Sequence, residues 1–297
     1  MMTNNNEMIR EMEWCRDIVD ERLHELLAEA GSSYATLVES MRYSLLAGGK
    51  RVRAVICMKF CEAAGGRPED ALDAACAIEL LHTYTLIHDD LPSMDGDDMR
   101  RGKASNHIEY GEFTAMLAGD ALQAVAFETI ANAALPPASV NQMIKILAYA
   151  AGPHGICGGQ YLDLSGEGWH LTIDELLELY AMKTAALISA AAKLGVIAGG
   201  GTFEQIAAAD AYAAAIGLAF QVRDDVLDCI ATAEELGKPA GSDEENDKST
   251  FASLLGVEAC EKMINKETEK AIAALKNKFD NTEFLTWLAF VLAERKN

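Results

Sequence analysis

The chain has 297 residues, 50% of them hydrophobic, and it carries 46 acidic residues against 25 basic ones, a formal net charge of −21. A chain of this length and composition can bury a sizeable core. The acidic balance argues against a nucleic-acid binder, which needs clustered lysine and arginine to contact phosphates. It also argues against attachment to anionic lipid by charge.

Seven cysteines are present, but no two of them form a CxxC pair. An odd number without that spacing predicts neither a disulfide framework nor a zinc site, and it favours buried free thiols in a reducing compartment. The N-terminal segment lacks the apolar stretch of a signal peptide. The most apolar run, residues 185–197, is interrupted by Lys193 and is too short to span a bilayer. We therefore expect a cytoplasmic protein with no membrane partner.

Helical periodicity dominates the chain. Segments such as 71–88, 113–134, 173–198 and 203–230 are rich in strong helix formers and carry apolar residues at three- and four-residue spacing. Alternating apolar and polar runs, which would predict strands, are missing. The sequence therefore predicts one all-helical domain, residues 1–297, with roughly ten or more helices.

Two polar, irregular stretches interrupt this pattern, at 89–111 and 237–249. Loops of this kind on a rigid helical scaffold are where functional residues concentrate. By contrast, 185–195 and 207–220 are apolar around most of the helical circumference, which predicts central helices that are buried on all sides.

The first candidate site in chain order is basic. The segment Gly48-Gly49-Lys50-Arg51-Val52-Arg53 opens a predicted helix after a glycine turn. Backbone N–H groups at a helix start, with lysine and arginine beside them, suit a diphosphate group. Short basic runs are common, so this segment is informative only together with the motifs that follow it.

An acidic cluster follows at the end of the helix predicted for 71–88. Five carboxylates fall within ten residues: Asp89, Asp90, Asp95, Asp97 and Asp98. Unpaired carboxylates repel one another, and a divalent cation would relieve that repulsion. Magnesium prefers one or two carboxylates together with waters and substrate phosphates. The alternative is an acidic surface loop.

Basic residues come directly after these acids, in the segment Arg100-Arg101-Gly102-Lys103. They could neutralise the carboxylates, or they could hold a metal-bridged phosphate chain. Further lysines occur in short motifs along the chain, namely Lys183, Lys238 and Lys248. In a chain this acidic, basic residues beside acid clusters indicate an anionic ligand.

A second acidic group lies in the predicted helix 203–230. At about 100° per residue, Asp224, Asp225 and Asp228 fall within an arc of roughly 100°, and Gln221 lies inside the same arc. Burying these carboxylates in an otherwise apolar segment without a partner would be costly. The pattern therefore favours a functional helix face over a solvated surface.

Motifs of several other enzyme classes are missing. The six histidines show no metal-ligand spacing, and no GxSxG, P-loop or HExxH motif occurs. Hydrolase and nucleoside-triphosphatase functions therefore lose their usual support.

Seven motifs occur in this order: GGKRVR, DDLPSMD…RRG, GGQYLDL, KTAALI, FQVRDDVLD, LGKPAGSD and KSTF. The ordered set closely resembles the trans-polyprenyl diphosphate synthases, above all the bacterial farnesyl diphosphate synthases. The match runs from about Tyr43 to Phe251, with a weaker echo at Arg295-Lys296. The resemblance implies an isoprenoid-synthase fold, a helical bundle around a deep central cavity, and assembly as a homodimer.

The resemblance also implies the residues of the site. The two aspartate motifs would face each other and hold about three magnesium ions. The direct ligands would be Asp89, Asp95 and Asp224, supported by Asp90, Asp225 and Asp228. The allylic diphosphate would contact Arg100, Lys183, Gln221 and Lys238. The diphosphate of isopentenyl diphosphate would contact Lys50, Arg53, His82 and Arg101.

Three further residues, Gly49, Thr184 and Lys248, complete the expected substrate-binding set. The residues expected to carry catalysis are Asp89, Asp90, Asp95, Arg100, Lys183, Asp224, Asp225 and Lys238. The implied reaction condenses isopentenyl diphosphate head to tail with dimethylallyl or geranyl diphosphate and gives farnesyl diphosphate. An allylic cation forms, the alkene attacks it, and a proton leaves to the departing diphosphate, with water excluded throughout.

Product length should depend on the depth of the pocket. Residues four and five positions before Asp89, namely Thr85 and Tyr84, lie roughly 6–8 Å deeper along the helix. Thr85 lies nearer the face of Asp89, while Tyr84 is about 140° away. The assignment of Tyr84 as the floor of a C15 pocket therefore comes from the resemblance, and an ordinary core role is the alternative.

The chain departs from the family pattern at a few positions. Gly96 replaces an aspartate, Ala54 replaces a proline, and Ala186 replaces a glycine. The expected carboxylates and cations all remain, so these departures bear on loop closure and product length.

Other functions are weighed against these residues. A geranylgeranyl or geranyl diphosphate synthase is the alternative within the family. A terpene cyclase would need no isopentenyl diphosphate site, so GGKRVR and Arg101 count against it. An inactive regulatory subunit tends to lose one aspartate motif, and here both are present.

Overall fold

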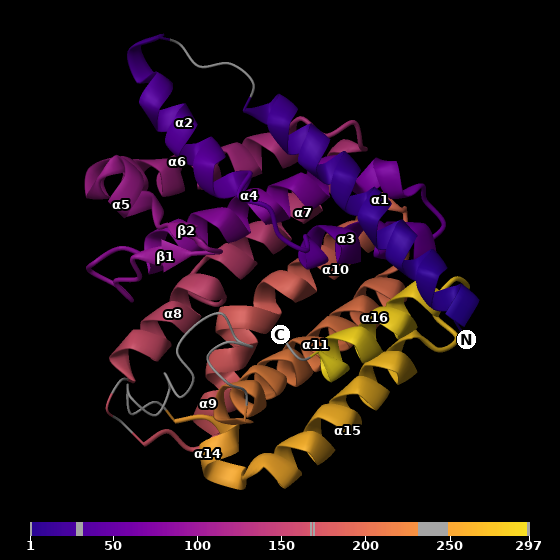
Figure 1. Ribbon diagram of the computed structural model, residues 1–297. Helices are drawn as coiled ribbons and strands as arrows, with labels where there is room; N and C mark the ends of the chain where they lie inside the picture. Colours follow the sequence, from indigo (N-terminus) through magenta and orange to yellow (C-terminus); the bar gives the residue numbers. More distant parts are fainter. Residues whose placement is uncertain (1, 28–31, 167, 169, 231–248, 296–297) are drawn as a thin grey trace. The chain divides into compact units, whose positions relative to one another are not determined.

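The computed structural model of the protein is shown in Figure 1. It describes residues 2–27, 32–166, 168, 170–230 and 249–295. Helices form nearly all the regular structure of these residues, and the strands among them are the two-residue β1 (Met99–Arg100) and β2 (Lys103–Ala104). The predicted all-helical fold is confirmed.

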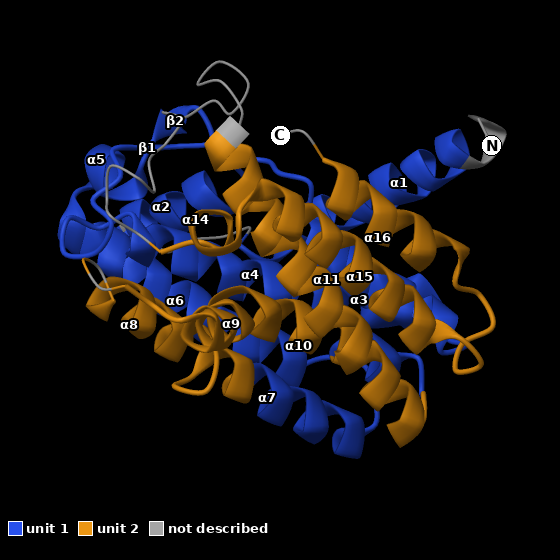
Figure 2. Ribbon diagram, turned by 90° about the horizontal axis from the view of Figure 1, so that it is seen from below, with its two compact units in different colours: residues 1–147, 194–200 blue, residues 148–193, 201–297 orange. Residues whose placement is uncertain are grey.

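The chain forms two compact units, coloured separately in Figure 2. The first comprises residues 1–147 and 194–200, and the second comprises residues 148–193 and 201–297. Two of the three boundaries fall inside α7 (Pro137–Ala151) and α10 (Ala186–Ala198), and the third falls in the segment that follows α10. The single domain expected over 1–297 and the central cavity expected within it stay predictions.

The first unit is built around two helices that are apolar on nearly every side. Its elements before α7 are α1 (Met2–Leu26), η1 (Ser32–Tyr34), α2 (Ala35–Leu45), α3 (Val52–Ala63), η2 (Pro68–Ala71), α4 (Leu72–Asp89), β1, β2, α5 (Asn106–Tyr110) and α6 (Glu112–Ala131). Most residues of α3 and α4 are buried, as expected for helices without a polar face. Helix α4 packs against α3 and along α6.

The second unit is arranged along one long helix. Its elements after α7 are α8 (Ile156–Ser165), α9 (Ile173–Tyr180), η3 (Ala181–Ala185), the first part of α10, α11 (Phe203–Ile230), α14 (Phe251–Leu255), α15 (Val257–Leu275) and α16 (Glu283–Glu294). Helices α11 and α15 run side by side in Figure 1 and pack closely. Val222 of α11, Ile264 of α15 and Phe251 of α14 are fully buried in one hydrophobic cluster.

Helical periodicity located the long helices to within a few residues. The predicted segments 71–88 and 203–230 correspond to α4 and α11. The predicted helix 173–198 is continuous, but its middle, η3, is a π-helical turn. Such turns are rare and often mark functional sites, and apolar spacing does not reveal them.

The irregular stretch 89–111 contains regular structure that the sequence did not predict. β1 and β2 form an antiparallel hairpin that pairs Met99 with Ala104 and Arg100 with Lys103. Strands of two residues are too short to show an alternating apolar and polar pattern, so the sequence does not reveal them. Of the other irregular stretch, 237–249, residues 237–248 lie outside the described residues.

Two helical segments, Ile173–Ala198 and Phe203–Cys229, are long and apolar enough to cross a bilayer by length and composition alone. The run 185–197, expected to be too short for a span, is part of the first of them. Their most apolar windows are 67% and 50% buried within the protein. Core helices of soluble proteins meet the same criterion, so this is weak evidence for a membrane segment.

Candidate active site

The glycine turn before α3 ends in a buried arginine. Arg51, the N-cap residue of α3, has a left-handed backbone with φ 49°. Its Nε donates to Asp20 Oδ1 at 2.8 Å and its Nη1 donates to Glu79 Oε2 at 3.3 Å. The other Glu79 oxygen accepts from the Ala54 N–H at 3.2 Å. Arg51 and Glu79 are therefore structural, and they fix the start of α3 against α4.

Arg53 and His82 lie together beside this start. Arg53 Nη1 donates to His82 Nε2 at 3.2 Å. Burial lowers the pKa of the Arg53 guanidinium, and the nearby Arg101 charge lowers it further. Burial, followed by the charges of Arg53 and Arg101, holds the pKa of His82 well below its usual range, so the imidazole is neutral and accepts the hydrogen bond.

Arg101 reaches the same place from the β1–β2 hairpin. Arg101 and Gly102 form its turn, with φ values of 53° and 75°, and two positive φ values match the right-handed twist of a tight hairpin. The Arg101 guanidinium donates to the Gly48 carbonyl. A Cβ at Gly49 would lie 3.2 Å from Arg101 Cζ, so the glycine leaves room for the guanidinium.

We call Gly49, Arg53, His82 and Arg101 the arginine–histidine cluster. Three of the four residues expected to hold the diphosphate of isopentenyl diphosphate are thus brought together, and Lys50, the fourth, is exposed next to Gly49. Arg53 Nε is a buried donor with no hydrogen-bond partner among the described residues. Arg53 is half-buried and Arg101 is exposed, and guanidinium groups that form no ion pair with a carboxylate are a favourable environment for an anion.

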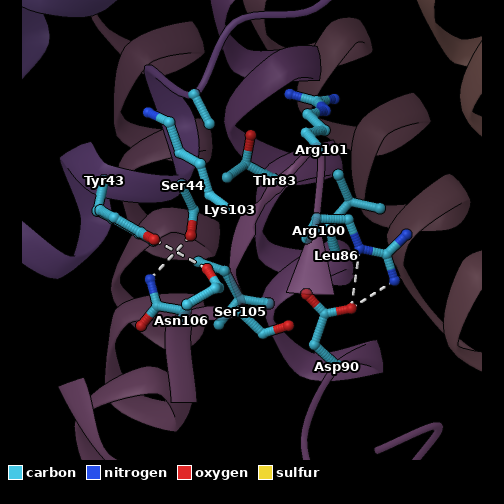
Figure 3. Close-up of a pocket in the computed structure, with 13 residues that line it drawn as sticks. Tyr43, Ser44, Thr83, Leu86, Asp90, Arg100, Arg101, Lys103, Ser105 and Asn106 are labelled. Atoms are coloured by element: carbon cyan, nitrogen blue, oxygen red, sulfur yellow. Dashed lines mark hydrogen bonds and ion pairs between the residues drawn. The ribbon is translucent and has the colours of Figure 1, made fainter. Parts of the chain in front are cut away.

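The hairpin is anchored by a polar network, of which Figure 3 shows Tyr43, Ser44 and Asn106. Asn106 Nδ2 donates to the Ser40 carbonyl and to Ser44 Oγ, both at 2.8 Å, and Asn106 Oδ1 accepts from Ser40 Oγ at 2.7 Å. The Tyr43 hydroxyl donates to the Ala104 carbonyl at 2.9 Å. The network encloses a cavity of about 20 Å³ and ties the hairpin to α2. Nothing in the spacing of these residues predicted it.

The first aspartate motif follows the end of α4. Asp89 is half-buried and Asp95 is exposed, and the Asp95 N–H donates to the Asp89 carbonyl at 2.9 Å, which closes the turn. Asp90 is buried and accepts from Arg100 Nε at 2.9 Å, and Arg100 Nη2 also donates to Asp97 Oδ2 at 3.2 Å (Figure 3). Burial raises the pKa of Asp90, while Arg100 opposes the shift.

Arg100 therefore neutralises the acids that precede it, which was one of the two readings of this basic run. A role for Arg100 at the allylic diphosphate stays a prediction, and it requires the guanidinium to be shared between the carboxylates and the ligand.

The second aspartate motif lines a pocket of about 250 Å³ within the second unit. The four residues that the helical arc grouped together, Gln221, Asp224, Asp225 and Asp228, all line it. So does Lys183 from η3. The predicted grouping is thus present, while Lys238 and Lys248 lie outside the described residues.

Asp225 is 4% exposed and its carboxylate has partners on two other elements. It accepts from the Tyr180 hydroxyl at 2.9 and 3.1 Å and from the Phe251 N–H at 2.7 Å. Asp225 therefore holds α9 and the start of α14 in place, consistent with the supporting role expected for it.

Asp224 is paired with an arginine from the end of the chain. Arg295 Nη2 donates to Asp224 Oδ1, and its guanidinium lies over the Phe220 ring, 3.6 Å from the centroid. Burial lowers the pKa of Arg295 to about 10, and the nearby Arg223 charge also lowers it. Arg295, which matches the family pattern only weakly, thus contacts Asp224, an expected metal ligand.

Lys183 is positioned by residues of the GGQYLDL motif on α8. Its Nζ donates to Asp163 Oδ2 at 2.5 Å. A Cβ at Gly159 would lie 2.3 Å from the Lys183 backbone nitrogen, so only glycine allows α8 to approach η3 this closely. Neither amide atom of the buried Gln160 has a partner among the described residues. Thr184 is buried beside Lys183.

Three pocket-lining or adjacent residues, Gln160, Asp163 and Tyr180, were not among the predicted site residues. For the first two the available signal was the GGQYLDL motif itself. Tyr180 gave no signal, because it lies in an ordinary amphipathic helix.

The two residues expected to set product length differ in their surroundings. Thr85 is buried and its hydroxyl donates to the His82 carbonyl of its own helix at 2.8 Å. Tyr84 is 6% exposed and its ring packs against the His88 ring. The two side chains therefore occupy different faces of α4, as the helical geometry predicted.

The acidic residues of the two motifs can be compared with the ligands that magnesium takes in proteins. Among the described residues, no three His, Cys, Asp or Glu side chains are close enough to hold a metal by themselves. Asp89 and Asp95 in the first unit, and Asp224 in the second, nevertheless supply carboxylate oxygens at solvent-accessible positions. Magnesium commonly takes one or two carboxylates plus phosphate oxygens and waters, so the carboxylates of each motif fit a metal that binds together with a diphosphate.

A helical fold with two aspartate motifs and a cluster of arginines beside a histidine suits enzymes that bind diphosphate substrates with a divalent metal. The sequence pattern of the polyprenyl synthetase family matches residues 34–287. The chain therefore belongs to the polyprenyl synthetase family, which confirms the resemblance of its motifs.

Relatives of known function extend over most of the chain. It is 42% identical to the farnesyl diphosphate synthase of Geobacillus stearothermophilus, over 88% of this chain and 89% of that protein. It is 45% identical to the chloroplastic heterodimeric geranylgeranyl pyrophosphate synthase large subunit 1 of Arabidopsis thaliana, over 87% of this chain and 72% of that protein. Both product lengths thus occur among the relatives.

The fold is also similar to that of a solved structure. The crystal structure of geranylgeranyl pyrophosphate synthetase from Pyrococcus horikoshii Ot3 matches with a TM-score of 0.89 and 33% sequence identity, covering 98% of this chain and 99% of that one. Family membership supports prenyltransferase activity. It does not determine the length of the product, which depends on the particular residues of this chain.

Proposed function

We propose that the protein condenses isopentenyl diphosphate with dimethylallyl and geranyl diphosphate, in a magnesium-dependent reaction, to give farnesyl diphosphate. The observation that carries this proposal is the arginine–histidine cluster, which offers an anion site made of residues of the first unit alone. A terpene cyclase has one diphosphate to bind and no use for such a cluster.

The cluster would hold isopentenyl diphosphate. The Arg53 and Arg101 guanidinium groups supply several donors, and the buried Arg53 Nε gains a partner when an anion binds. His82 orients Arg53 through its neutral imidazole. Binding of this kind fixes the diphosphate and leaves the alkene to be directed towards the allylic partner.

The allylic diphosphate would be bound by the aspartate motifs. Asp89, Asp95 and Asp224 would hold about three magnesium ions, which when bound neutralise the charge that develops on the leaving diphosphate. Lys183 would donate to the diphosphate oxygens from a position set by Asp163. Asp225 would keep Asp224 in place through its bonds to Tyr180 and Phe251.

The last step is the loss of a proton from the condensed product. The pocket residues of the second unit that bear charge are either carboxylates or the lysine paired with one. We propose that the departing diphosphate accepts the proton, which requires no side-chain base. Apolar surroundings would keep water from the allylic cation.

We propose that Tyr84 limits the product to C15. Its ring is nearly buried on α4, one turn or more before Asp89. A side chain of this size at the end of the pocket would stop the product from growing further, by steric exclusion. A geranylgeranyl product is the alternative, because relatives of that kind match the chain equally well.

We also propose that the protein acts as a cytoplasmic homodimer. Helices α5 and α6 expose four large apolar side chains: Ile108 (53%), Phe113 (76%), Met116 (48%) and Leu117 (50%). Clustered exposure of this kind marks an interaction surface, and sedimentation of the purified protein would measure its mass.

A product assay tests the proposed reaction. The purified protein receives magnesium, isopentenyl diphosphate and one of dimethylallyl, geranyl or farnesyl diphosphate, and chain lengths are read by mass spectrometry, with a chelator as the control. We expect a C15 product from the first two primers and no extension of farnesyl diphosphate. A C20 or longer product would overturn the farnesyl assignment, and no condensation from any primer would overturn the synthase itself.

A further inference from the structure

Tyr84 forms a ring pair with the next turn of its own helix. The Tyr84 and His88 rings are 5.2 Å apart between centroids at an interplanar angle of 87°, an edge-to-face contact. The two residues are separated by four positions, so their side chains lie one above the other on the same face of α4. The packing of Tyr84 therefore depends on where the His88 ring is held.

His88 is held by the backbone of α6. Its Nε2 is 2.9 Å from the Met116 carbonyl oxygen, and because a carbonyl only accepts, the imidazole donates there. Asp120 Oδ1 lies 3.9 Å from the same nitrogen. The ring is thus directed towards α6.

This contact requires a glycine on α6. A Cβ at Gly119 would lie 2.2 Å from His88 Nε2 and 2.4 Å from Cδ2. Contacts this short are not possible, so any larger residue would expel the ring. Gly119 and the Met116 carbonyl together define one position for the His88 imidazole.

The chain of contacts has a consequence for Tyr84. Edge-to-face aromatic pairs contribute about 0.5–1.5 kcal/mol beyond area burial, which corresponds to roughly 2- to 12-fold in the population of one rotamer over another. Loss of the His88 ring would remove this contact, and Tyr84 would then populate a second staggered rotamer more often. A floor that changes rotamer admits a longer chain.

We infer that His88, held by Gly119 and the Met116 carbonyl of α6, is a positioning residue that fixes Tyr84 and so sharpens the product length. The inference rests on the proposed role of Tyr84 as the floor. His88 itself touches no reacting atom in this scheme. It acts through Tyr84, and Gly119 acts through His88.

The first test compares the products of His88→Ala with those of the wild type and Tyr84→Ala. We expect Tyr84→Ala to lengthen the main product, and His88→Ala to raise the fraction of products longer than the wild-type product by about 2- to 10-fold. The KM values for isopentenyl and geranyl diphosphate should stay within about twofold of those of the wild type, because neither His88 nor Tyr84 contacts a diphosphate in this scheme.

The second test uses the contact between helices. Gly119→Ala should displace the ring and shift the products in the same direction as His88→Ala. In the double variant, the methyl group of residue 119 occupies space that the imidazole has left. The double variant should therefore match His88→Ala alone, a non-additive result expected of residues that act in one chain of contacts. It also provides a folded variant if Gly119→Ala alone is unstable.

A second tyrosine–histidine pair supplies the control. Tyr149 and His154, in the second unit, stack with their centroids 5.3 Å apart. His154→Ala removes a ring contact of similar size away from α4, and it should leave the product length unchanged.

The outcomes separate this inference from the proposed function. A wild-type product of C20 would overturn the farnesyl assignment, yet a further shift in His88→Ala would still support the positioning role. Wild-type products from folded His88→Ala, alongside longer products from Tyr84→Ala, would overturn that role. Unchanged products from Tyr84→Ala would overturn both the floor and its positioning by His88.

Discussion

The arginine–histidine cluster of the first unit and the acidic pocket of the second differ in how their charges are balanced. Among the described residues, no carboxylate forms an ion pair with Arg53 or Arg101, whose hydrogen bonds go to an imidazole and a carbonyl. In the acidic pocket, Lys183 is paired with Asp163 and Asp224 with Arg295. The two arginines of the first region thus have no ion-pair partner among the described residues, whereas Lys183 and Asp224 of the second region each have one.

The difference indicates how each region would meet its ligand. An anion that enters the cluster gains cationic donors without displacing any acid, so that region is organised before binding. In the acidic pocket, existing ion pairs must exchange their partners for magnesium and diphosphate. We therefore expect binding to the cluster to be independent of magnesium, and binding to the pocket to depend on it. The predictions that follow test this contrast.

The largest effect is expected at the acidic pocket. Asp224→Ala removes an expected magnesium ligand and should lower kcat by on the order of 10²-fold or more, measured by steady-state condensation, with circular dichroism to show that the variant is folded. Asp210→Ala, an exposed acid on the same helix that pairs with Lys193, is the control. Wild-type rates in folded Asp224→Ala would remove Asp224 from the metal site.

A smaller effect is expected at the cluster. Arg53→Gln should raise the KM for isopentenyl diphosphate by on the order of 10- to 100-fold, since hydrogen bonds to charged groups contribute about 1.5–3 kcal/mol. The KM for geranyl diphosphate should change little. Arg67→Gln, at an exposed arginine paired with Asp70, is the control. Equal changes in both KM values would show that the two regions do not bind separate substrates.

The smallest effect is expected from the partner of Lys183. Asp163→Asn keeps the shape of the side chain but loses the charge that orients Lys183 Nζ, so the KM for geranyl diphosphate should rise by about 3- to 10-fold. The KM for isopentenyl diphosphate should not change. Asp174→Asn, an exposed acid at the start of α9, is the control. A lower KM for geranyl diphosphate would mean instead that Asp163 competes with the substrate.

Periodic features of this molecule could be predicted from the sequence, because they depend on geometry within one helix. The spacing of Gln221, Asp224 and Asp228 places them on one face of α11, and all three line the same pocket. The angular offset between Tyr84 and Thr85 likewise appears in their different contacts.

Contacts between elements could not be predicted in this way. The bonds of Asp225 to Tyr180 and to the Phe251 N–H join segments that are far apart in the chain, so they follow from tertiary packing. The π-helical turn at Lys183 lies close to α8, and the only sign of this close approach in the sequence is Gly159. The sequence left open whether Arg100 pairs with the neighbouring carboxylates or holds a phosphate chain, and the structure shows its bond to Asp90.

The hairpin turn at Arg101 has a consequence for how this protein can be stabilised. A left-handed backbone costs about 1–2 kcal/mol for a residue other than glycine, and Arg101 has φ 53°. Glycine at this position would relieve the strain and remove the guanidinium at the same time. Selection for thermal stability alone would therefore favour loss of Arg101, whereas selection for binding would retain it, so variants that tolerate heat better at this turn should be poorer enzymes.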